Sequence, residues 1–199
     1  KQTVVYNGID RSVFRPLPGV KKKKGKIIFV GNVEDGKKGF AYLLKAMPRI
    51  DRRVTVTAVE GGAPHHKVTD RLMEKFGLRD RIVFTGKTST EDLVRHYSES
   101  ELAIVPSVYE GFGLPAAEAM ACGVPVVSSD GGALPEVVGD AGVVVPARDE
   151  YALADAVNAL IADPRRRRDM GEAGIERVKK HFNWVKAVEE IIAVYRRFL

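Results

Sequence analysis

Two glutamates eight positions apart, Glu110 and Glu118, are the residues whose type and spacing could do chemistry. Apolar helical residues surround Glu118, and a carboxylate in such surroundings costs several kcal/mol unless it is hydrogen-bonded. An ionised carboxylate accepts two O–H bonds, so Glu118 would suit a vicinal diol such as that of ribose. The alternative interpretation is that Glu118 pairs with a core arginine and that Glu110 is a solvated loop acid.

The segment between the two acids presents backbone N–H groups at the start of a helix. An apolar run, 102–105, predicts a buried strand before it, and the helix begins near Pro115 and ends at Gly123. The amides of Gly111, Phe112, Gly113 and Leu114 then lie at a helix N-terminus, which favours anions. The segment therefore predicts a ligand that carries both phosphate and hydroxyl groups, although the glycines alone could make a structural turn.

A second candidate cluster follows the strand predicted over 26–30. Its polar loop contains Lys37 and Lys38 and ends at Gly39, after which apolar residues recur at helical spacing. Ligands of open α/β sheets lie beyond the carboxyl ends of the strands, so both lysines are placed to meet phosphate. The alternative is a pair of exposed lysines in a turn.

The segment 110–118, continued by 119–127 and 131–136, resembles the E-x7-E signature of retaining GT-B glycosyltransferases of family 4. The resemblance covers essentially the whole chain. It implies an α/β fold with a Rossmann-like doubly wound parallel sheet flanked by helices, the C-terminal half of a GT-B fold. It also implies a UDP-, GDP- or ADP-sugar donor, with no cofactor and no metal. By this resemblance Glu118 binds the ribose, and Glu110 is the catalytic-site residue that contacts the transferred sugar near the reaction centre. The backbone of Phe112, Gly113 and Leu114 contacts the sugar and phosphates, and Gly111 is counted with the donor-binding residues.

The same resemblance extends to the cationic residues. Lys38 before Gly39 matches a lysine that binds the diphosphate, whereas Asn32 stands where the family has an arginine, so Lys37 is expected to share that role. Lys87, after the strand predicted over 81–85, is expected beside the nucleotide base.

The domain organisation follows from the resemblance. Residues 1–199 form one nucleotide-sugar-binding domain, with 1–20 as an interdomain connection and 183–199 as a C-terminal helix, introduced by Trp184, that crosses to the other domain. The N-terminal domain, which would hold a glycan, lipid or small-molecule acceptor, is absent, so we expect the isolated domain to transfer nothing.

Composition limits the class of protein. The 199 residues are 45% hydrophobic and 29% charged, as in a soluble globular domain, and no apolar run is long enough to cross a membrane. The start of the chain is not a secretory signal, so we expect a cytoplasmic location. The single cysteine, Cys122, leaves no disulfide framework or cysteine-based zinc site, and His65 and His66 are interpreted as exposed loop residues. Scarce Asn and Gln beside many charges favour a thermophilic source.

The net charge of +6 comes largely from two runs, 21–24 and 165–168. No aromatic residues interleave with them, so we expect no nucleic-acid binding. Solvated surface is the preferred interpretation, and contact with anionic lipid at a membrane is the second.

Two other functions compete with the glycosyltransferase. Gly111, Gly113 and Ala116 fit the weak dinucleotide fingerprint of an oxidoreductase, with Asp130 as the ribose acid. Pro115, Glu118 and the late position of the motif argue against it. A basic, non-enzymatic binder of nucleic acid or anionic lipid would rest on the charge runs alone. The predicted strands lie at 4–6, 26–30, 53–59, 81–85, 102–105, 124–128 and 142–146, and the predicted later helices at 68–76, 151–161, 166–180 and 185–198.

Overall fold

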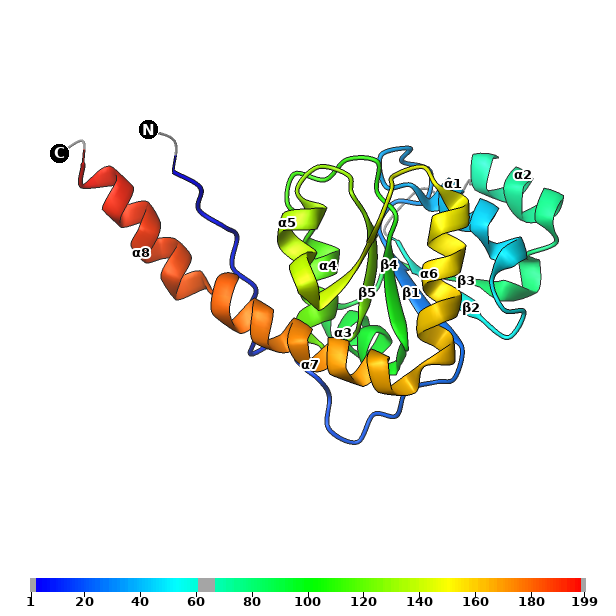
Figure 1. The fold of residues 1–199 in the computed structure, drawn as a ribbon, viewed down its shortest axis with the longest axis horizontal. Coiled ribbons are helices and arrows are strands. Elements are labelled where there is room, and N and C mark those ends of the chain that lie inside the picture. Colours follow the sequence, from blue (N-terminus) through cyan, green and yellow to red (C-terminus); the bar gives the residue numbers. More distant parts are fainter. Residues whose placement is uncertain (1–2, 61–66, 198–199) are drawn as a thin grey trace.

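A six-stranded parallel sheet forms the centre of the molecule (Figure 1). The computed structural model describes residues 3–60 and 67–197. The strand order is β3-β2-β1-β4-β5-β6, which is the doubly wound arrangement predicted from the sequence. The strands are β1 (Lys26–Val30), β2 (Thr55–Val59), β3 (Ile82–Gly86), β4 (Leu102–Val105), β5 (Val126–Ser129) and β6 (Gly142–Val145).

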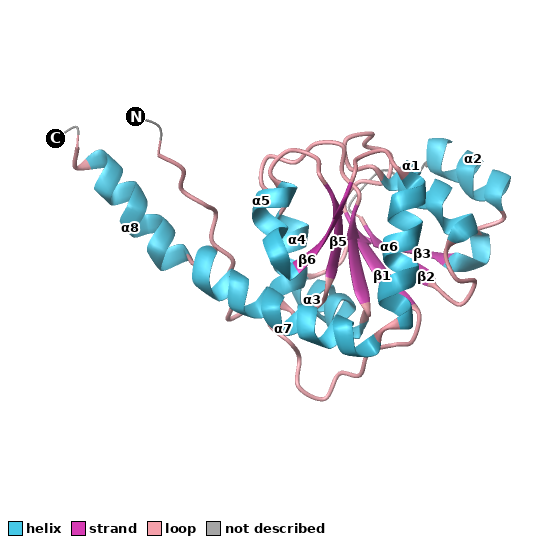
Figure 2. Ribbon diagram, viewed as in Figure 1, coloured by secondary structure: helices cyan, strands magenta, loops and turns pink. Residues whose placement is uncertain are grey.

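Helices cover both faces of the sheet (Figure 2). Successive strand residues point to opposite faces, so Ile27 and Phe29 of β1 pack with one core and Ile28 with the other. The helices are α1 (Phe40–Ala46), α2 (Lys67–Phe76), α3 (Thr90–Glu99), α4 (Leu114–Ala121), α5 (Leu134–Val138), α6 (Glu150–Ala162), α7 (Pro164–His181) and α8 (Trp184–Tyr195). α1 and α6 line the first core, and α3, α4 and α5 line the second. Burial on both faces explains the continuous apolar runs of the strands.

The strand predicted at 4–6 is wrong. Residues 3–10 form neither helix nor strand and run beside the junction of α7 and α8 (Figure 1). Ile9 N donates to the carbonyl of Phe182 at 2.9 Å, and the ring of Tyr6 packs edge-on against Phe182. A helix offers no ladder of free backbone groups, so the apolar side chains of this segment find packing partners but the backbone finds no strand partner.

Other predictions differ only at their ends. β2 begins at Thr55 rather than at 53 because the carboxylate of Asp51 accepts from the backbone N–H of Arg53 and forms a turn there. β5 begins at Val126, directly after Pro125, which has no N–H to give to a ladder. None of the described helices has the length and apolar character needed to span a bilayer.

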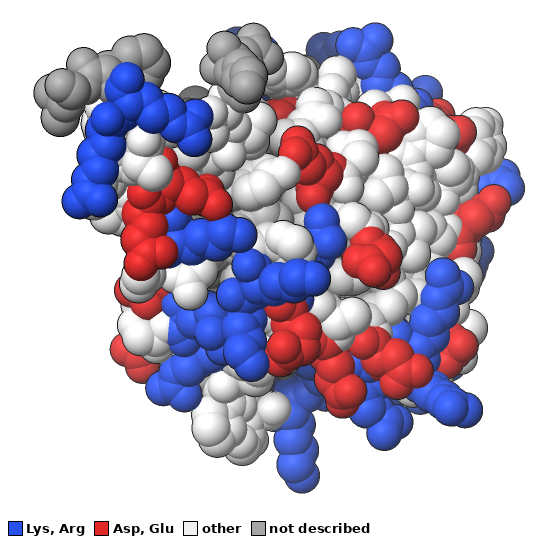
Figure 3. All heavy atoms as spheres, turned by 60° about the vertical axis from the view of Figure 1, so that its left-hand side comes forward, with Lys and Arg blue, Asp and Glu red and all other residues white. Residues whose placement is uncertain are grey.

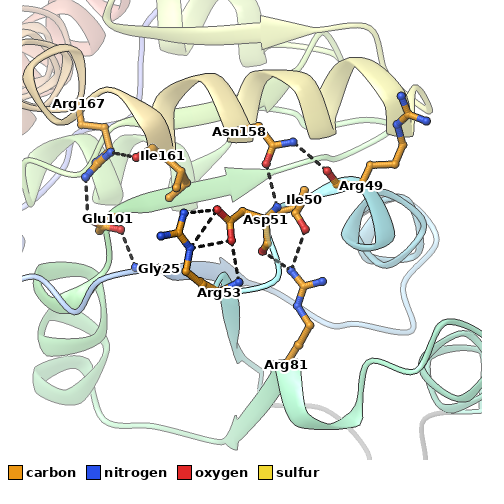
Figure 4. Close-up of polar contacts among 10 residues, drawn as sticks. All are labelled: Gly25, Arg49, Ile50, Asp51, Arg53, Arg81, Glu101, Asn158, Ile161 and Arg167. Atoms are coloured by element: carbon orange, nitrogen blue, oxygen red, sulfur yellow. Dashed lines mark hydrogen bonds and ion pairs between the residues drawn. The ribbon is translucent and has the colours of Figure 1, made fainter.

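Arginine side chains hold the loops at the amino ends of the strands (Figure 4). Arg167 Nη2 donates to Glu101 Oε1 at 2.7 Å, while Gly25 N donates to Glu101 Oε2 at 2.7 Å. Arg167 Nη1 also donates to the last carbonyls of α6, and Arg81 donates to carbonyls of the loop before β2. Solvated surface is therefore the wrong interpretation for Arg167, whose side chain is 13% exposed.

An ion-pair group ties α3 to β1 at the same end of the sheet. Glu99 Oε2 accepts from Lys26 Nζ at 2.8 Å and from Lys23 Nζ at 2.9 Å. Burial of Glu99 opposes its ionisation, but the hydrogen bonds and charges of the two lysines outweigh burial and hold the pKa of Glu99 at about 2.

Candidate functional site

The loops after β1 and β4 meet where the strand order reverses, the position at which doubly wound sheets bind ligands. Val108 N, in the loop after β4, donates to the carbonyl of Lys37 in the loop after β1 at 2.7 Å. Gly39 has a φ of +71°, and a Cβ there would clash with the carbonyl oxygen of Pro106. The close approach of the two loops therefore requires glycine at position 39.

The loop after β5 fixes the backbone around Glu110 from the other side. Ala133 N donates to the carbonyl of Glu110 at 2.9 Å, and a Cβ at Gly132 would clash with the same carbonyl. The hydroxyl of Ser129 donates to the carbonyl of Ser107. Three strand ends thus position the first acid of the candidate pair.

The Glu110 carboxylate is held by two donors and is only 11% exposed. Ser107 Oγ donates to Glu110 Oε1 at 2.9 Å, and Lys38 Nζ donates to the same oxygen at 2.8 Å. The structure therefore brings together Lys38 and Glu110, which the sequence placed on different loops of one site. An ammonium carries three donors, so the contact with Glu110 leaves Lys38 two N–H groups for a phosphate.

The Glu118 carboxylate lies one turn inside α4 and is half-buried. Its Oε2 accepts from the hydroxyl of Tyr97, on α3, at 3.1 Å. Burial raises the pKa of Glu118, and the hydrogen bond from Tyr97 acts against that shift. No arginine among residues 3–60 and 67–197 contacts Glu118, so the alternative of a core Arg–Glu pair is wrong.

The glycine turn before α4 leaves the first amides of that helix without a side-chain cap. Gly113 has a φ of +97°, and a Cβ there would lie 2.6 Å from Leu134 Cδ2. The ring of Phe112 packs edge-on against Phe182 at 5.3 Å, while Gly111 and Leu114 are exposed. The side chain of Phe112 thus belongs to the core, and the turn offers its backbone N–H groups to an anion.

The remaining predicted residues do not join the acid pair. The side-chain Oδ1 of Asn32 accepts from the backbone N–H of Glu34 at 2.9 Å, so the Asn32 side chain closes a turn of its own loop. Lys37 is exposed, and Lys87 follows the edge strand β3, which β2 separates from β1. His65 and His66 lie outside the described residues. The part of the chain that the structure describes contains no group of three His, Cys, Asp or Glu residues placed to hold a metal ion.

The oxidoreductase alternative is not supported. The glycine turn follows β4 rather than the first strand of the sheet. Asp130, its expected ribose acid, accepts the N–H of Ala147 at 2.7 Å and so serves the loop after β6.

Sequence reasoning missed two residues of the site, Ser107 and Tyr97. Ser107 follows β4 almost directly, so its place at the carboxyl end of a strand was a usable signal. Tyr97 lies at helical spacing with the apolar residues Leu93 and Val94 of α3, a pattern that by itself indicates packing rather than a contact with a ligand site. Only the packing of α3 against α4 brings its hydroxyl to Glu118.

A doubly wound sheet with an acid pair and a glycine turn at its switch point defines the C-terminal domain of a GT-B glycosyltransferase. The family model for glycosyl transferases group 1 matches residues 10–177. The chain belongs to this family.

Comparisons with individual proteins agree. The MMP alpha-(1->4)-mannosyltransferase of Mycolicibacterium hassiacum is 36% identical over 98% of this chain and 48% of its own length. The GDP-mannose-dependent alpha-(1-6)-phosphatidylinositol monomannoside mannosyltransferase of Mycolicibacterium smegmatis is 36% identical over 74% of this chain and 42% of its own. The structure of sucrose-phosphate synthase from Thermosynechococcus elongatus superposes with a TM-score of 0.90 at 32% identity, covering 98% of this chain and 52% of that one. The chain spans about half the length of the relatives it matches.

Proposed function

We propose that this chain binds the nucleotide-diphosphate sugar of a retaining hexosyltransferase at the switch point of its sheet. One observation carries the proposal: Lys38, Ser107 and Glu110 converge beside the uncapped start of α4, with Glu118 one turn inside that helix. A cation and free amides suit a diphosphate, and two carboxylates suit sugar hydroxyls. The name of one relative, a GDP-mannose-dependent mannosyltransferase, supports a nucleotide-sugar donor.

Each residue has a defined role in this proposal. The amides of 111–114 and the Lys38 ammonium stabilise the negative charge that develops on the departing diphosphate. Lys37, in the same loop as Lys38, supplies a further positive charge for the diphosphate. Glu118 accepts the ribose hydroxyls, Glu110 orients the transferred sugar, and Lys87 and Asn32 lie toward the nucleotide. Because the chain supplies this charge stabilisation itself, the proposal requires no cofactor and no metal.

The acceptor would be held by an N-terminal half of the whole protein. α8 extends away from the sheet (Figure 1). Its apolar side chains are exposed: Trp184 is 52% exposed, Ile192 43% and Tyr195 67%. Exposed apolar side chains gathered along one helix are typical of a surface that docks against another domain. We propose that residues 1–20 and 183–199 connect to that half. The acceptor is a glycan, lipid or small molecule, and the isolated chain transfers no sugar. Turnover by the isolated chain would contradict this.

The two basic runs of the sequence meet at the amino end of the sheet. Lys22 and Arg168 line the same pocket, of about 430 Å³, whose walls include Leu17, Val20 and Ile175. Figure 3 shows one face of the molecule, on which Lys and Arg side chains gather toward the lower left with Asp and Glu side chains around them. Cations beside apolar side chains suit anionic lipid headgroups, so we propose that the protein is cytoplasmic and contacts a membrane peripherally. Cosedimentation with phosphatidylserine vesicles but not with phosphatidylcholine vesicles tests this.

Calorimetry with UDP, GDP, ADP and NAD tests the donor assignment. We expect the chain to bind one nucleoside diphosphate and to lose that binding in Glu118→Ala. A preference for NAD over every diphosphate would instead favour an oxidoreductase. Steep, salt-dependent binding of polynucleotides without nucleotide binding would favour a basic binding module.

A further inference from the structure

Each acid of the site uses only one of its two carboxylate oxygens for contacts with the protein. Glu110 accepts both Ser107 and Lys38 at Oε1, and Glu118 accepts Tyr97 at Oε2. No described residue donates to Glu110 Oε2 or Glu118 Oε1. Neither of these oxygens is among the buried side-chain atoms that lack a partner, so both are reached by solvent.

We propose that Ser107 and Tyr97 are positioning residues, each of which anchors one carboxylate oxygen so that the other oxygen faces the donor. Tyr97 aims Glu118 Oε1 at the ribose, and Ser107 aims Glu110 Oε2 at the transferred sugar. This inference rests on the proposed function. It adds two residues to the site. It also divides the site into a part that binds the nucleotide, where Tyr97 orients Glu118, and a part that binds the sugar, where Ser107 orients Glu110.

Ser107 can anchor Glu110 because its own backbone is fixed. The residue is 1% exposed, and its carbonyl accepts the hydroxyl of Ser129. Gly131 packs so closely against this carbonyl that a Cβ there would clash with it. A buried serine whose carbonyl is held by Ser129 and Gly131 has little freedom, so its hydroxyl fixes the orientation of the carboxylate.

Tyr97 can anchor Glu118 because it is rigid and stays protonated. The side chain is 1% exposed, and burial, together with the charge of Glu118, raises its pKa well above the ordinary value for tyrosine. The phenol is therefore a donor throughout the working pH range. It has two acceptors in reach, Glu118 Oε2 at 3.1 Å and the carbonyl of Pro115 at 3.3 Å. Its single proton goes to the carboxylate, because a charge-assisted hydrogen bond is the stronger of the two.

The test compares Tyr97→Phe with Ser107→Ala, each of which removes one hydroxyl. The chain is titrated with UDP, GDP and ADP and with their glucose and mannose conjugates, and the best-binding pair is used for every variant. Tyr97→Phe should weaken binding of the nucleoside diphosphate about tenfold, which is about 1.4 kcal/mol. It should leave unchanged the ratio of the affinity for the sugar conjugate to the affinity for the diphosphate. Ser107→Ala should leave the affinity for the nucleoside diphosphate unchanged and reduce the ratio of conjugate affinity to diphosphate affinity by about threefold or more.

Matched controls separate positioning from packing. Ser128 is buried and its hydroxyl has no hydrogen-bond partner among the described residues, so Ser128→Ala should change neither measurement. Adding Tyr97→Phe to Glu118→Gln should weaken binding less than adding it to wild type, because the hydrogen bond from Tyr97 to a neutral amide oxygen is weaker than its bond to the carboxylate. This comparison holds even where Tyr97→Phe alters stability.

The pH dependence gives a readout that a purely structural tyrosine would not move. The hydrogen bond from Tyr97 lowers the pKa of Glu118, so its loss should move the acid limb of nucleotide binding to higher pH. The inference would be overturned if both variants weakened nucleotide binding and sugar binding equally. It would also be overturned if Tyr97→Phe left the acid limb of the binding-versus-pH curve where it is in wild type. If wild type binds a diphosphate and Glu118→Ala does not, while Tyr97→Phe binds normally, only the inference fails. If wild type binds no diphosphate, it and the proposed function fail together.

Discussion

Replacing Glu118 with glutamine should change stability and ligand binding in opposite directions. Burial raises the pKa of Glu118 in the folded protein. A carboxyl with a higher pKa folded than unfolded binds more protons in the folded state, so stability falls as pH rises through the interval between the two pKa values. Above that interval the ionised form carries the full penalty. Glutamine keeps the shape. When its carbonyl oxygen accepts the Tyr97 hydrogen bond, its amide NH2 takes the place of Oε1 and makes neutral hydrogen bonds with the ribose.

The expected loss of binding follows from the hydrogen bonds to the ribose. A bond to an ionised acceptor contributes about 1.5–3 kcal/mol and a neutral one about 0.5–1.5 kcal/mol. Two ribose hydroxyls therefore lose about 1 kcal/mol each, roughly 2 kcal/mol in total, which weakens the nucleoside diphosphate by about 30-fold.

Urea unfolding at pH 8 and calorimetry with the best-binding nucleoside diphosphate measure the two effects. Glu118→Gln should be at least as stable as wild type at pH 8 and lose that advantage as the pH falls below the folded-state pKa. Glu172→Gln removes the same charge from an exposed position of α7 and should change neither quantity. Undiminished binding by Glu118→Gln, or destabilisation by more than about 1 kcal/mol at pH 8, would refute the reasoning.

Three further outcomes concern the scaffold. Gly39→Ala should lower the free energy of unfolding, measured in urea, by more than about 3 kcal/mol, because its Cβ would clash with a carbonyl and its positive φ strains alanine. Gly19 has a similar φ but open surroundings, so Gly19→Ala should cost about 1 kcal/mol. Arg167→Ala should cost about 3–5 kcal/mol by leaving a mostly buried acid unpaired, and Arg166→Ala less than about 0.5 kcal/mol. The lowered pKa of Glu99 contributes stability above pH 4.5 that is lost as pH falls toward 2. In Glu99→Gln the free energy of unfolding should fall less than in wild type between pH 4.5 and pH 2. An equal fall in both proteins would contradict this role of Glu99.

The strands and the glycine turn were predictable because local signals define them. β1 and β4 are apolar runs bounded by Gly, Pro or polar residues, and Gly113 with Pro115 announces a helix start. Glu118 was singled out because a carboxylate in apolar surroundings requires a partner, and Glu110 was singled out through the family resemblance; their roles in a site stay predictions.

Local patterns misled where pairing depends on distant segments. Residues 4–6 carry strand-like side chains, but no edge of the sheet reaches them, so they pack against Phe182 instead. Arg167 belongs to a run that suggested solvent, and only the position of α7 gives it Glu101 as a partner.

The amino-acid sequence by itself determined the class of fold and the glycine turn that begins α4, because periodicity and glycine are properties of neighbours along the chain. The tertiary structure alone decided which oxygen of each acid is held and by what. Ser107 reaches Glu110 only because loops after three strands close on one another. The hydroxyl of Tyr97 meets Glu118 only because α3 packs on α4, and the spacing of residues along the chain does not specify contacts between separate elements.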